Sequence, residues 1–199
     1  MNTKKGFTLL ELLIVIGILA ILSTTIVLVI NPAELLRKAR DSQRISDLNT
    51  MKTAIAYYVT EEGDPYIGDE GATYSDVGAV TCFGEADAAS GFTTDGNGWI
   101  PVKFNEMTGG SPIAALPSDP IGTTETADPG HYYVYGVGSE TDYTFKLVAN
   151  MESAYYSENG DGDVESTDGG THGGLYEVGT AMTLRATPTA SCYADEVSP

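Results

Sequence analysis

A run of carboxylate and amide side chains near the C-terminus has the composition of a cation site. Asp161, Asp163 and Asp168 lie among glycines in residues 159–170. Oxygen ligands at alternate positions of a flexible turn suit Ca²⁺. The helix-loop-helix calcium motif is not met, because Val164 stands where that motif requires glycine and no glutamate closes the loop. The segment therefore predicts either a calcium site or a solvated acidic loop.

Groups suited to catalysis are scarce in this sequence. His131 and His172 are its two histidines, the side chains that ordinarily titrate near neutral pH. Each lies beside a glycine, which is typical of surface turns. The sequence has no G-x-S-x-G nucleophile elbow, no phosphate-binding Gly-Lys-Ser/Thr and no H-E-x-x-H zinc motif. We therefore expect no enzymatic activity.

Charge is distributed unevenly along the 199 residues. The chain carries 10 basic and 28 acidic side chains, a net charge of −18. This balance argues against nucleic-acid binding, which requires a basic surface. Residues 1–60 hold seven bases and four acids, whereas residues 61–199 hold three bases and 24 acids. A slightly basic stem thus precedes an acidic, turn-rich body of the kind that suits an extracytoplasmic domain.

The two cysteines, Cys82 and Cys192, show no metal-ligand spacing. If the body is exported, we expect them to form a disulfide, since oxidising compartments favour one. Closing a loop of about 110 residues would stabilise the body by roughly 4 to 5 kcal/mol on the chain-entropy model. Two buried free thiols are the alternative.

An apolar segment near the N-terminus contains one carboxylate. From Phe7 to Ile30 the only charged residue is Glu11, and a helix of this length spans about 36 Å, enough to cross a bilayer. A cleaved signal peptide fits poorly because no small-x-small cleavage site follows the segment. A plain membrane anchor fits in length, but a carboxylate inside such a segment is rare without a partner.

The residues around that carboxylate carry a family resemblance. Lys4-Lys5-Gly6 followed by Phe7-Thr8-Leu9-Leu10-Glu11-Leu12 resembles the leader and mature N-terminus of bacterial type IV pilins and of the pseudopilins of type II secretion. The resemblance implies that prepilin peptidase cuts between Gly6 and Phe7 and that the new amine of Phe7 is methylated. It places Glu11 at the fifth mature position, where the family carries a glutamate. A positive amine at the positive end of a helix dipole favours an anionic partner, so Glu11 could pair with the Phe7 amine of a neighbouring subunit and specify assembly.

The resemblance also implies location, partners and a cofactor. The precursor would lie in the inner membrane and later form a cell-surface filament or a periplasmic pseudopilus. Its partners would be further copies of the chain, prepilin peptidase and the pilus or secretion assembly machinery. No cofactor is required, but major pseudopilins bind Ca²⁺ in a C-terminal acidic loop. The segment 116–122 resembles one that precedes the sheet in the major pseudopilin of type II secretion.

The elements that position these residues are expected to form a pilin-like α+β fold, with a long N-terminal helix packed against a small antiparallel sheet. We divide the chain into a leader (1–6), a membrane and filament-core helix (7–30), an amphipathic helix that continues the stem (31–62) and an acidic head (63–199). Apolar residues recur at helical spacing on the amphipathic helix: Ile45, Leu48, Met51, Ile55 and Tyr58. The opposite, basic face would meet acidic neighbouring bodies, or solvent and lipid headgroups.

Two residues are expected to interrupt the long helix. Gly17 weakens it, and Pro32 removes a helical hydrogen bond. Pro32 predicts either a kink or a new helix that begins at the proline after an Asn31 cap.

Alternation of apolar and polar residues predicts strands in the head. A hairpin is expected over 133–151, and further strands over 99–104 and 175–184. Residues 63–97 are expected to hold little regular structure.

The function favoured by these observations is that of a structural subunit of a type IV pilus-like filament. One alternative is a pseudopilin of a type II secretion system. The other is a membrane-anchored binding domain that does not polymerise.

Overall fold

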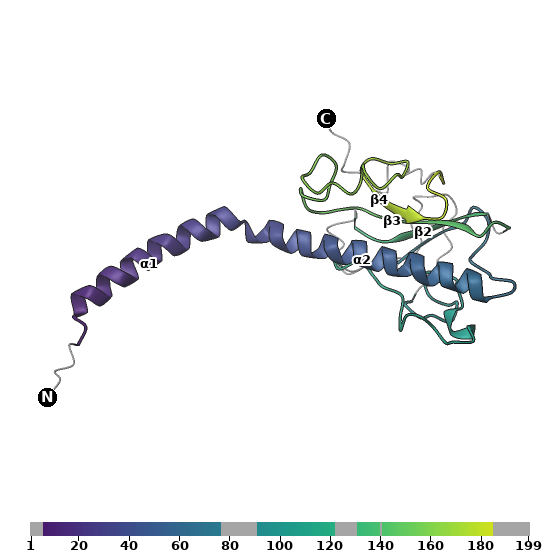
Figure 1. Cartoon of the computed structure of the whole chain (residues 1–199), viewed down its shortest axis with the longest axis horizontal. Helices are drawn as coiled ribbons and strands as arrows, with labels where there is room; N and C mark the ends of the chain where they lie inside the picture. Colours follow the sequence, from purple (N-terminus) through teal and green to yellow (C-terminus); the bar gives the residue numbers. More distant parts are fainter. Residues whose placement is uncertain (1–5, 77–90, 122–130, 140, 185–199) are drawn as a thin grey trace. The chain divides into compact units, whose positions relative to one another are not determined.

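The computed structural model describes residues 6–76, 91–121, 131–139 and 141–184, without the side chains of residues 27–30. Two helices come first, α1 (Leu9–Ile30) and α2 (Pro32–Glu61). Four strands follow, β1 (Thr73–Ser75), β2 (Val134–Ser139), β3 (Thr144–Ala149) and β4 (Tyr176–Gly179), with the short 3-10 helix η2 (Phe104–Glu106) between β1 and β2 (Figure 1). The helices with this small sheet confirm the predicted pilin-like α+β fold.

The chain falls into two compact units, Met1–Arg37 and Lys38–Pro199. The first contains α1 and the beginning of α2, and the second contains the rest of α2 and the sheet. The side chains of the hydrophobic core all come from the second unit. We call this second unit the body, and it has a core of its own.

The four strands form one antiparallel sheet in the order β1-β2-β3-β4. The hairpin of β2 and β3 pairs Tyr135 with Leu147 and Val137 with Phe145, with an irregularity between Val137 and Ser139. These residues are at most 2% exposed. The alternation that predicted the hairpin thus places one set of side chains on the face that packs in the core.

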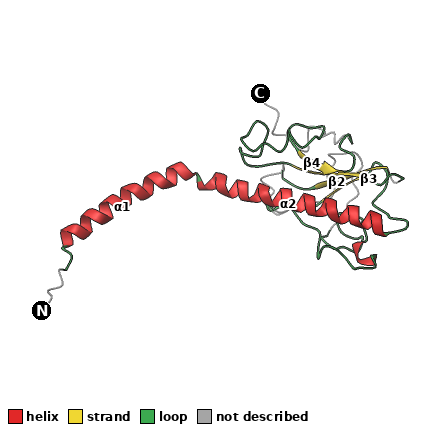
Figure 2. Cartoon of the chain, viewed as in Figure 1, coloured by secondary structure: helices red, strands yellow, loops and turns green. Residues whose placement is uncertain are grey.

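Helix α2 supplies the other side of this core (Figure 2). Leu48, Met51 and Ile55 are fully buried and Tyr58 is 4% exposed, with Ile45 packed at the margin. The Tyr58 ring meets the Phe104 ring edge-on at 5.9 Å between centroids. The apolar stripe predicted from three- and four-residue spacing is therefore confirmed as the packing face.

The predicted strand over residues 99–104 is wrong. Trp99, Ile100, Val102 and Phe104 are buried, but this segment has no strand, and Phe104 begins η2. Pro101 has no backbone N–H to donate to a strand ladder, and the segment's pairing is limited to an isolated bridge between Asp95 and Lys103. In contrast, β4 lies within the strand predicted over 175–184, and β1 lies in a stretch expected to be irregular.

Candidate processing and assembly site

The junction between Gly6 and Phe7 lies just before α1. Residues 6–8 are exposed and not helical, and the exposed fraction of Phe7 is 88%. A Cβ atom added at Gly6 would meet no other atom within 4 Å. The fold of this chain therefore does not require glycine at position 6. An exposed, non-helical junction is accessible to a protease.

Glu11 lies in the first turn of α1 and forms a reciprocal cap with Thr8. The Glu11 amide donates to Thr8 Oγ1 at 3.2 Å, and the Thr8 amide donates to Glu11 Oε2 at 2.8 Å. Thr8 Oγ1 also donates to Glu11 Oε2 at 2.9 Å. Sequence analysis missed the role of Thr8, although threonine followed three residues later by glutamate is the signature of this capping box. The carboxylate is consequently held at the amide that follows Phe7.

Helix α1 exposes apolar side chains throughout residues 9–26, the part of the helix whose side chains are described. Its segment Leu9–Ile26 is long and apolar enough to cross a membrane, and none of it is buried. Ser23 Oγ and Thr24 Oγ1 donate to the carbonyls of Leu19 and Ala20, each at 2.7 Å. These hydroxyls are satisfied within the helix, so they add little cost to an apolar environment. Gly17 lies inside the uninterrupted helix, and bending there stays a prediction.

The two helices are separate at Asn31. Asn31 adopts the left-handed conformation, with φ 45° and ψ 77°, and ends α1. Its carbonyl accepts hydrogen bonds from the amides of Glu34 and Leu35 at 3.0 and 3.3 Å. Pro32 is then the first residue of α2, where its missing N–H costs nothing. Of the two arrangements predicted around Pro32, this geometry matches the new helix.

The predicted basic face of α2 requires a correction at Arg44. Its guanidinium is fully buried and donates to Asp119 through Nε at 2.6 Å and Nη2 at 2.9 Å. Nη1 donates to Asp41 at 2.7 Å. Burial opposes the charge of Arg44, but the hydrogen bonds and charges of Asp119 and Asp41 raise its pKa above the usual value. Arg44 therefore ties α2 to the loop before the sheet and is not available to a neighbouring subunit.

Other bases of this face are also engaged within the chain. Arg40 donates to both carboxylate oxygens of Glu152, and the Lys38 ammonium lies 4.1 Å from the centroid of the Tyr155 ring. Arg37 lies 3.7 Å from Glu34. Arg40 and Lys38 thus hold a loop of the same chain against α2, whereas Arg37 pairs within the helix.

Two buried carboxyls tie together segments of the body. Asp76 accepts from the amides of Asp119 and Tyr133, at 2.8 and 2.9 Å. Glu165 accepts from the amides of Met151 and Glu158, at 2.9 and 2.8 Å. Burial raises the pKa of Asp76 to about 6 and that of Glu165 to about 7, because desolvation outweighs the backbone hydrogen bonds.

The three carboxylates predicted to bind Ca²⁺ do not form a cluster. Asp163 accepts from the amides of Asn159 and Ser166, both at 3.0 Å, and so closes its own turn. Asp168 accepts from the amides of Gly170 and Glu177, while Asp161 is exposed. In the parts of the chain that the structure describes, no group of three or more His, Cys, Asp or Glu side chains is placed to hold a metal ion. The residues present therefore do not fit a calcium site.

Asp168 instead covers part of the edge of the sheet. The amide of Glu177, in strand β4, donates to Asp168 Oδ2. The Glu177 carboxylate is fully buried, lies 2.6 Å from Lys146 Nζ and accepts from the amides of Thr171 and His172. The loop 168–172 is thereby fixed against the last strand.

The remaining predicted site residues divide into two groups. Cys82 and Cys192 lie outside the described residues, and their disulfide stays a prediction. His172 is half-buried, and its Nδ1 accepts from the amide of Gly174 at 3.2 Å within a turn. His131 is half-buried just before β2.

Comparison with known families identifies the N-terminal segment. Residues 1–27 match a family model described as the prokaryotic N-terminal methylation motif. This is the prepilin motif of type IV pilins and pseudopilins, a family that is structural rather than catalytic. The chain thus carries a prepilin motif at the position where the structure places an exposed junction and an apolar helix. Neither the curated proteins nor the solved structures include a significant match to it.

Proposed function

We propose that this protein is a structural subunit of a type IV pilus-like filament. Prepilin peptidase removes residues 1–6 in the inner membrane, and the mature chain, N-methylated at Phe7, polymerises through α1. The body then forms the outside of the filament. The observation that carries the proposal is the combination of the matched methylation motif with a helix that is apolar and exposed.

Glu11 supplies the electrostatic part of this proposal. Its carboxylate lies at the amide of Thr8, one residue from the amine that cleavage would create. The amine of its own Phe7 and that of a neighbouring subunit are competing partners. A charge without a partner in apolar surroundings is costly, so a neighbour that brings its amine to Glu11 in correct axial register is favoured over one that does not.

A pseudopilin of a type II secretion system is the second candidate. The segment 116–122, which resembles one in the major pseudopilin, contains Asp119, and the structure uses this residue as the bidentate partner of Arg44. The buried ion pair gives Asp119 a structural role in the described part of this segment, residues 116–121.

Mass spectrometry of the native protein distinguishes these functions. We expect a mature N-terminal peptide that begins at N-methylated Phe7, in sheared surface material as well as in membranes. Methylated Phe7 confined to membranes would favour the pseudopilin. An intact leader in every fraction would contradict processing and favour the membrane-anchored binding domain.

Two substitutions separate the capping role of Glu11 from a role in assembly. Glu11→Gln keeps a side chain that can form the capping box but removes the charge. Thr8→Ala removes the cap and keeps the charge. We expect Glu11→Gln to abolish filaments while cleavage continues, and Thr8→Ala to retain them. The reverse pattern would show that Glu11 acts on the helix terminus rather than on a neighbouring subunit.

A further inference from the structure

A polar pocket of about 360 Å³ lies between the segment that follows α2 and the turn that joins β2 to β3. This volume falls within the roughly 300 to 1,000 Å³ that is usual for small-molecule sites. The described residues that line the pocket include two tyrosines, Tyr66 and Tyr143, one carboxylate, that of Asp64, and no base. A ligand in this pocket would therefore meet aromatic rings and a negative charge.

Hydrogen bonds within the body fix the position of Tyr66. Its amide donates to Tyr58 Oη at 3.3 Å, and its hydroxyl donates to Asp69 Oδ1 at 2.8 Å. Asp69 is held in turn, because its own amide donates to Tyr74 Oη at 3.3 Å. Tyr58 and Tyr74 are buried, whereas Tyr66 is 45% exposed. A ring that is fixed and accessible can bind a ligand at a small cost in side-chain ordering.

The second tyrosine, Tyr143, lines the pocket from a backbone conformation that is unfavourable for it. Its φ is 51°, in the left-handed region where a bulky side chain is an outlier. Glycine is the usual residue at such a position in a hairpin turn. Tyr143 packs half-buried against the core and also lines the pocket. Backbone strain of this kind is concentrated at ligand sites in proteins, so the ring has a use there besides packing.

The charges around the pocket favour a cation as its ligand. Residues 61–70 hold five acids and no base, so the local potential attracts cations and repels anions. The faces of tyrosine rings attract a cation that lies within about 6 Å of the ring centroid. A bare Ca²⁺ ion takes six to eight oxygen ligands, and one carboxylate does not supply them. An organic cation, in contrast, can be held by rings and a single counter-charge.

We propose that this pocket binds a quaternary ammonium group, with the rings of Tyr66 and Tyr143 against its methyl groups and the Asp64 carboxylate as its counter-charge. A primary ammonium group is compact and strongly hydrated, and it requires hydrogen-bond acceptors. A methylated nitrogen combines positive charge with an apolar surface, which matches two aromatic rings beside one carboxylate. This site lies within the body and does not rest on the proposed filament function.

Binding of choline to the full chain in a non-ionic detergent tests this inference. Saturation-transfer NMR should show a saturable contact between the protein and the trimethyl protons of choline. The neutral analogue 3,3-dimethylbutanol has the same shape without the charge, and it should bind at least about tenfold more weakly, because it lacks the attraction of the rings for a cation. Equal binding of the two compounds would overturn the proposal, and so would the absence of a saturable choline signal.

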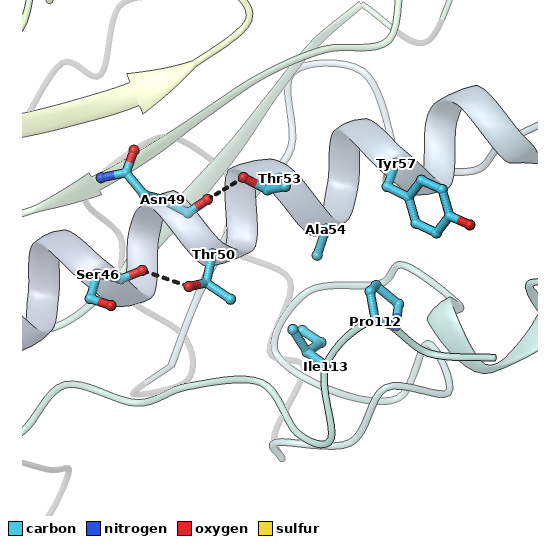
Figure 3. A pocket seen from close by; sticks show the side chains of 8 residues that line it. All are labelled: Ser46, Asn49, Thr50, Thr53, Ala54, Tyr57, Pro112 and Ile113. Atoms are coloured by element: carbon cyan, nitrogen blue, oxygen red, sulfur yellow. Dashed lines mark hydrogen bonds between the residues drawn. The ribbon is translucent and has the colours of Figure 1, made fainter. Parts of the chain in front are cut away.

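Substitutions in the pocket identify the groups that hold the cation. Tyr66→Ala should weaken choline binding by about fivefold or more, and Tyr66→Phe, which keeps a ring, by less than about twofold. Asp64→Asn should weaken it by about two- to fivefold, and less at high salt. Tyr57→Ala is the matched control, because Tyr57 is 49% exposed but lines a different groove, beside Pro112 and Ile113 (Figure 3). No carboxylate is among the described residues of that groove, so this variant should bind choline like wild type.

Tyr143→Gly separates binding from packing. It removes the ring and supplies the residue that tolerates the left-handed backbone, so the release of strain offsets part of the lost packing. We expect choline binding to weaken by about fivefold or more while a cooperative melting transition shows that the body is folded. A folded Tyr143→Gly or Tyr66→Ala chain that binds choline as tightly as wild type would overturn the proposed site.

Glycerophosphocholine distinguishes the two sources of a quaternary ammonium group. It carries the headgroup of phosphatidylcholine without the acyl chains, and its phosphate is repelled by acidic surroundings. We expect choline to bind more tightly, which would assign the site to a free cation. Equal binding of the two compounds would support the same site with a lipid headgroup as its ligand. Failure of both to bind would overturn the site and leave the filament function unaffected.

Discussion

Replacing Arg44 tests whether the buried ion network fixes α2 to the body. Arg44→Met would leave the buried carboxylates of Asp41 and Asp119 without their cation. Breaking a buried pair by removing one partner costs about 3 to 5 kcal/mol, a large part of the roughly 5 to 15 kcal/mol that stabilises a typical domain. At about 2 to 4 °C per kcal/mol for a domain of this size, the melting temperature should fall by about 6 to 20 °C.

Urea and thermal unfolding of the fragment 31–199 measure this change. Arg37→Met is the matched control on the same helix, because the Arg37 side chain is 50% exposed and lies 3.7 Å from Glu34. It should cost less than about 1 kcal/mol. Adding Asp119→Asn to Arg44→Met should cost less than the two single changes together, by about 1 kcal/mol or more. The reasoning would be refuted if Arg44→Met destabilised the fragment no more than Arg37→Met.

Three further outcomes are expected. The raised pKa values of Asp76, about 6, and Glu165, about 7, mean that the folded body binds these protons at a pH where the unfolded chain has released them. The melting temperature should therefore rise as pH falls from 8 to 5, and Glu165→Gln should flatten this rise; an unchanged profile would contradict it. Because Asp163 and Asp168 accept backbone hydrogen bonds, Ca²⁺ should leave the melting temperature unchanged; a gain that Asp161→Asn abolishes would restore the calcium prediction. Assembly should weaken at low ionic strength because the bodies repel one another, and turbidity that grows as salt is removed would refute this.

The parts of the fold that follow from local pattern were predictable. The stripe from Leu48 to Tyr58 has helical spacing, and the hairpin around Tyr135 and Phe145 alternates with the period of a strand. Each pattern indicates which side of a helix or strand faces the core. Such a pattern lies within one element and does not depend on residues distant in the sequence. The three-residue strand β1 is too short to show a period.

Features that depend on contacts distant in sequence were not predictable. Arg44 looks like a solvated base on a helix, and its burial depends on Asp119, which lies 75 residues further along the chain. The hydrogen-bond partners of the acidic loop were not predictable for a similar reason. Its carboxylates accept hydrogen bonds from backbone amides of its own turns and of strand β4. Composition alone does not show which amides will lie close enough to donate. The capping box of Thr8 and Glu11, in contrast, could be recognised from the sequence, because threonine followed three residues later by glutamate is its signature.

The hydrogen bond between the Glu177 amide and Asp168 has a consequence for crowding. In a filament, bodies lie side by side at a local concentration far above that of a dilute solution. A strand edge with unpaired amides is a template for cross-β aggregation under such conditions. Because the Asp168 carboxylate accepts the hydrogen bond of the Glu177 amide, β4 has one donor fewer for pairing with a strand of another chain. The negative charge of Asp168 also repels other acidic chains. If the proposed filament forms, β4 therefore offers crowded bodies fewer free donors for strand pairing.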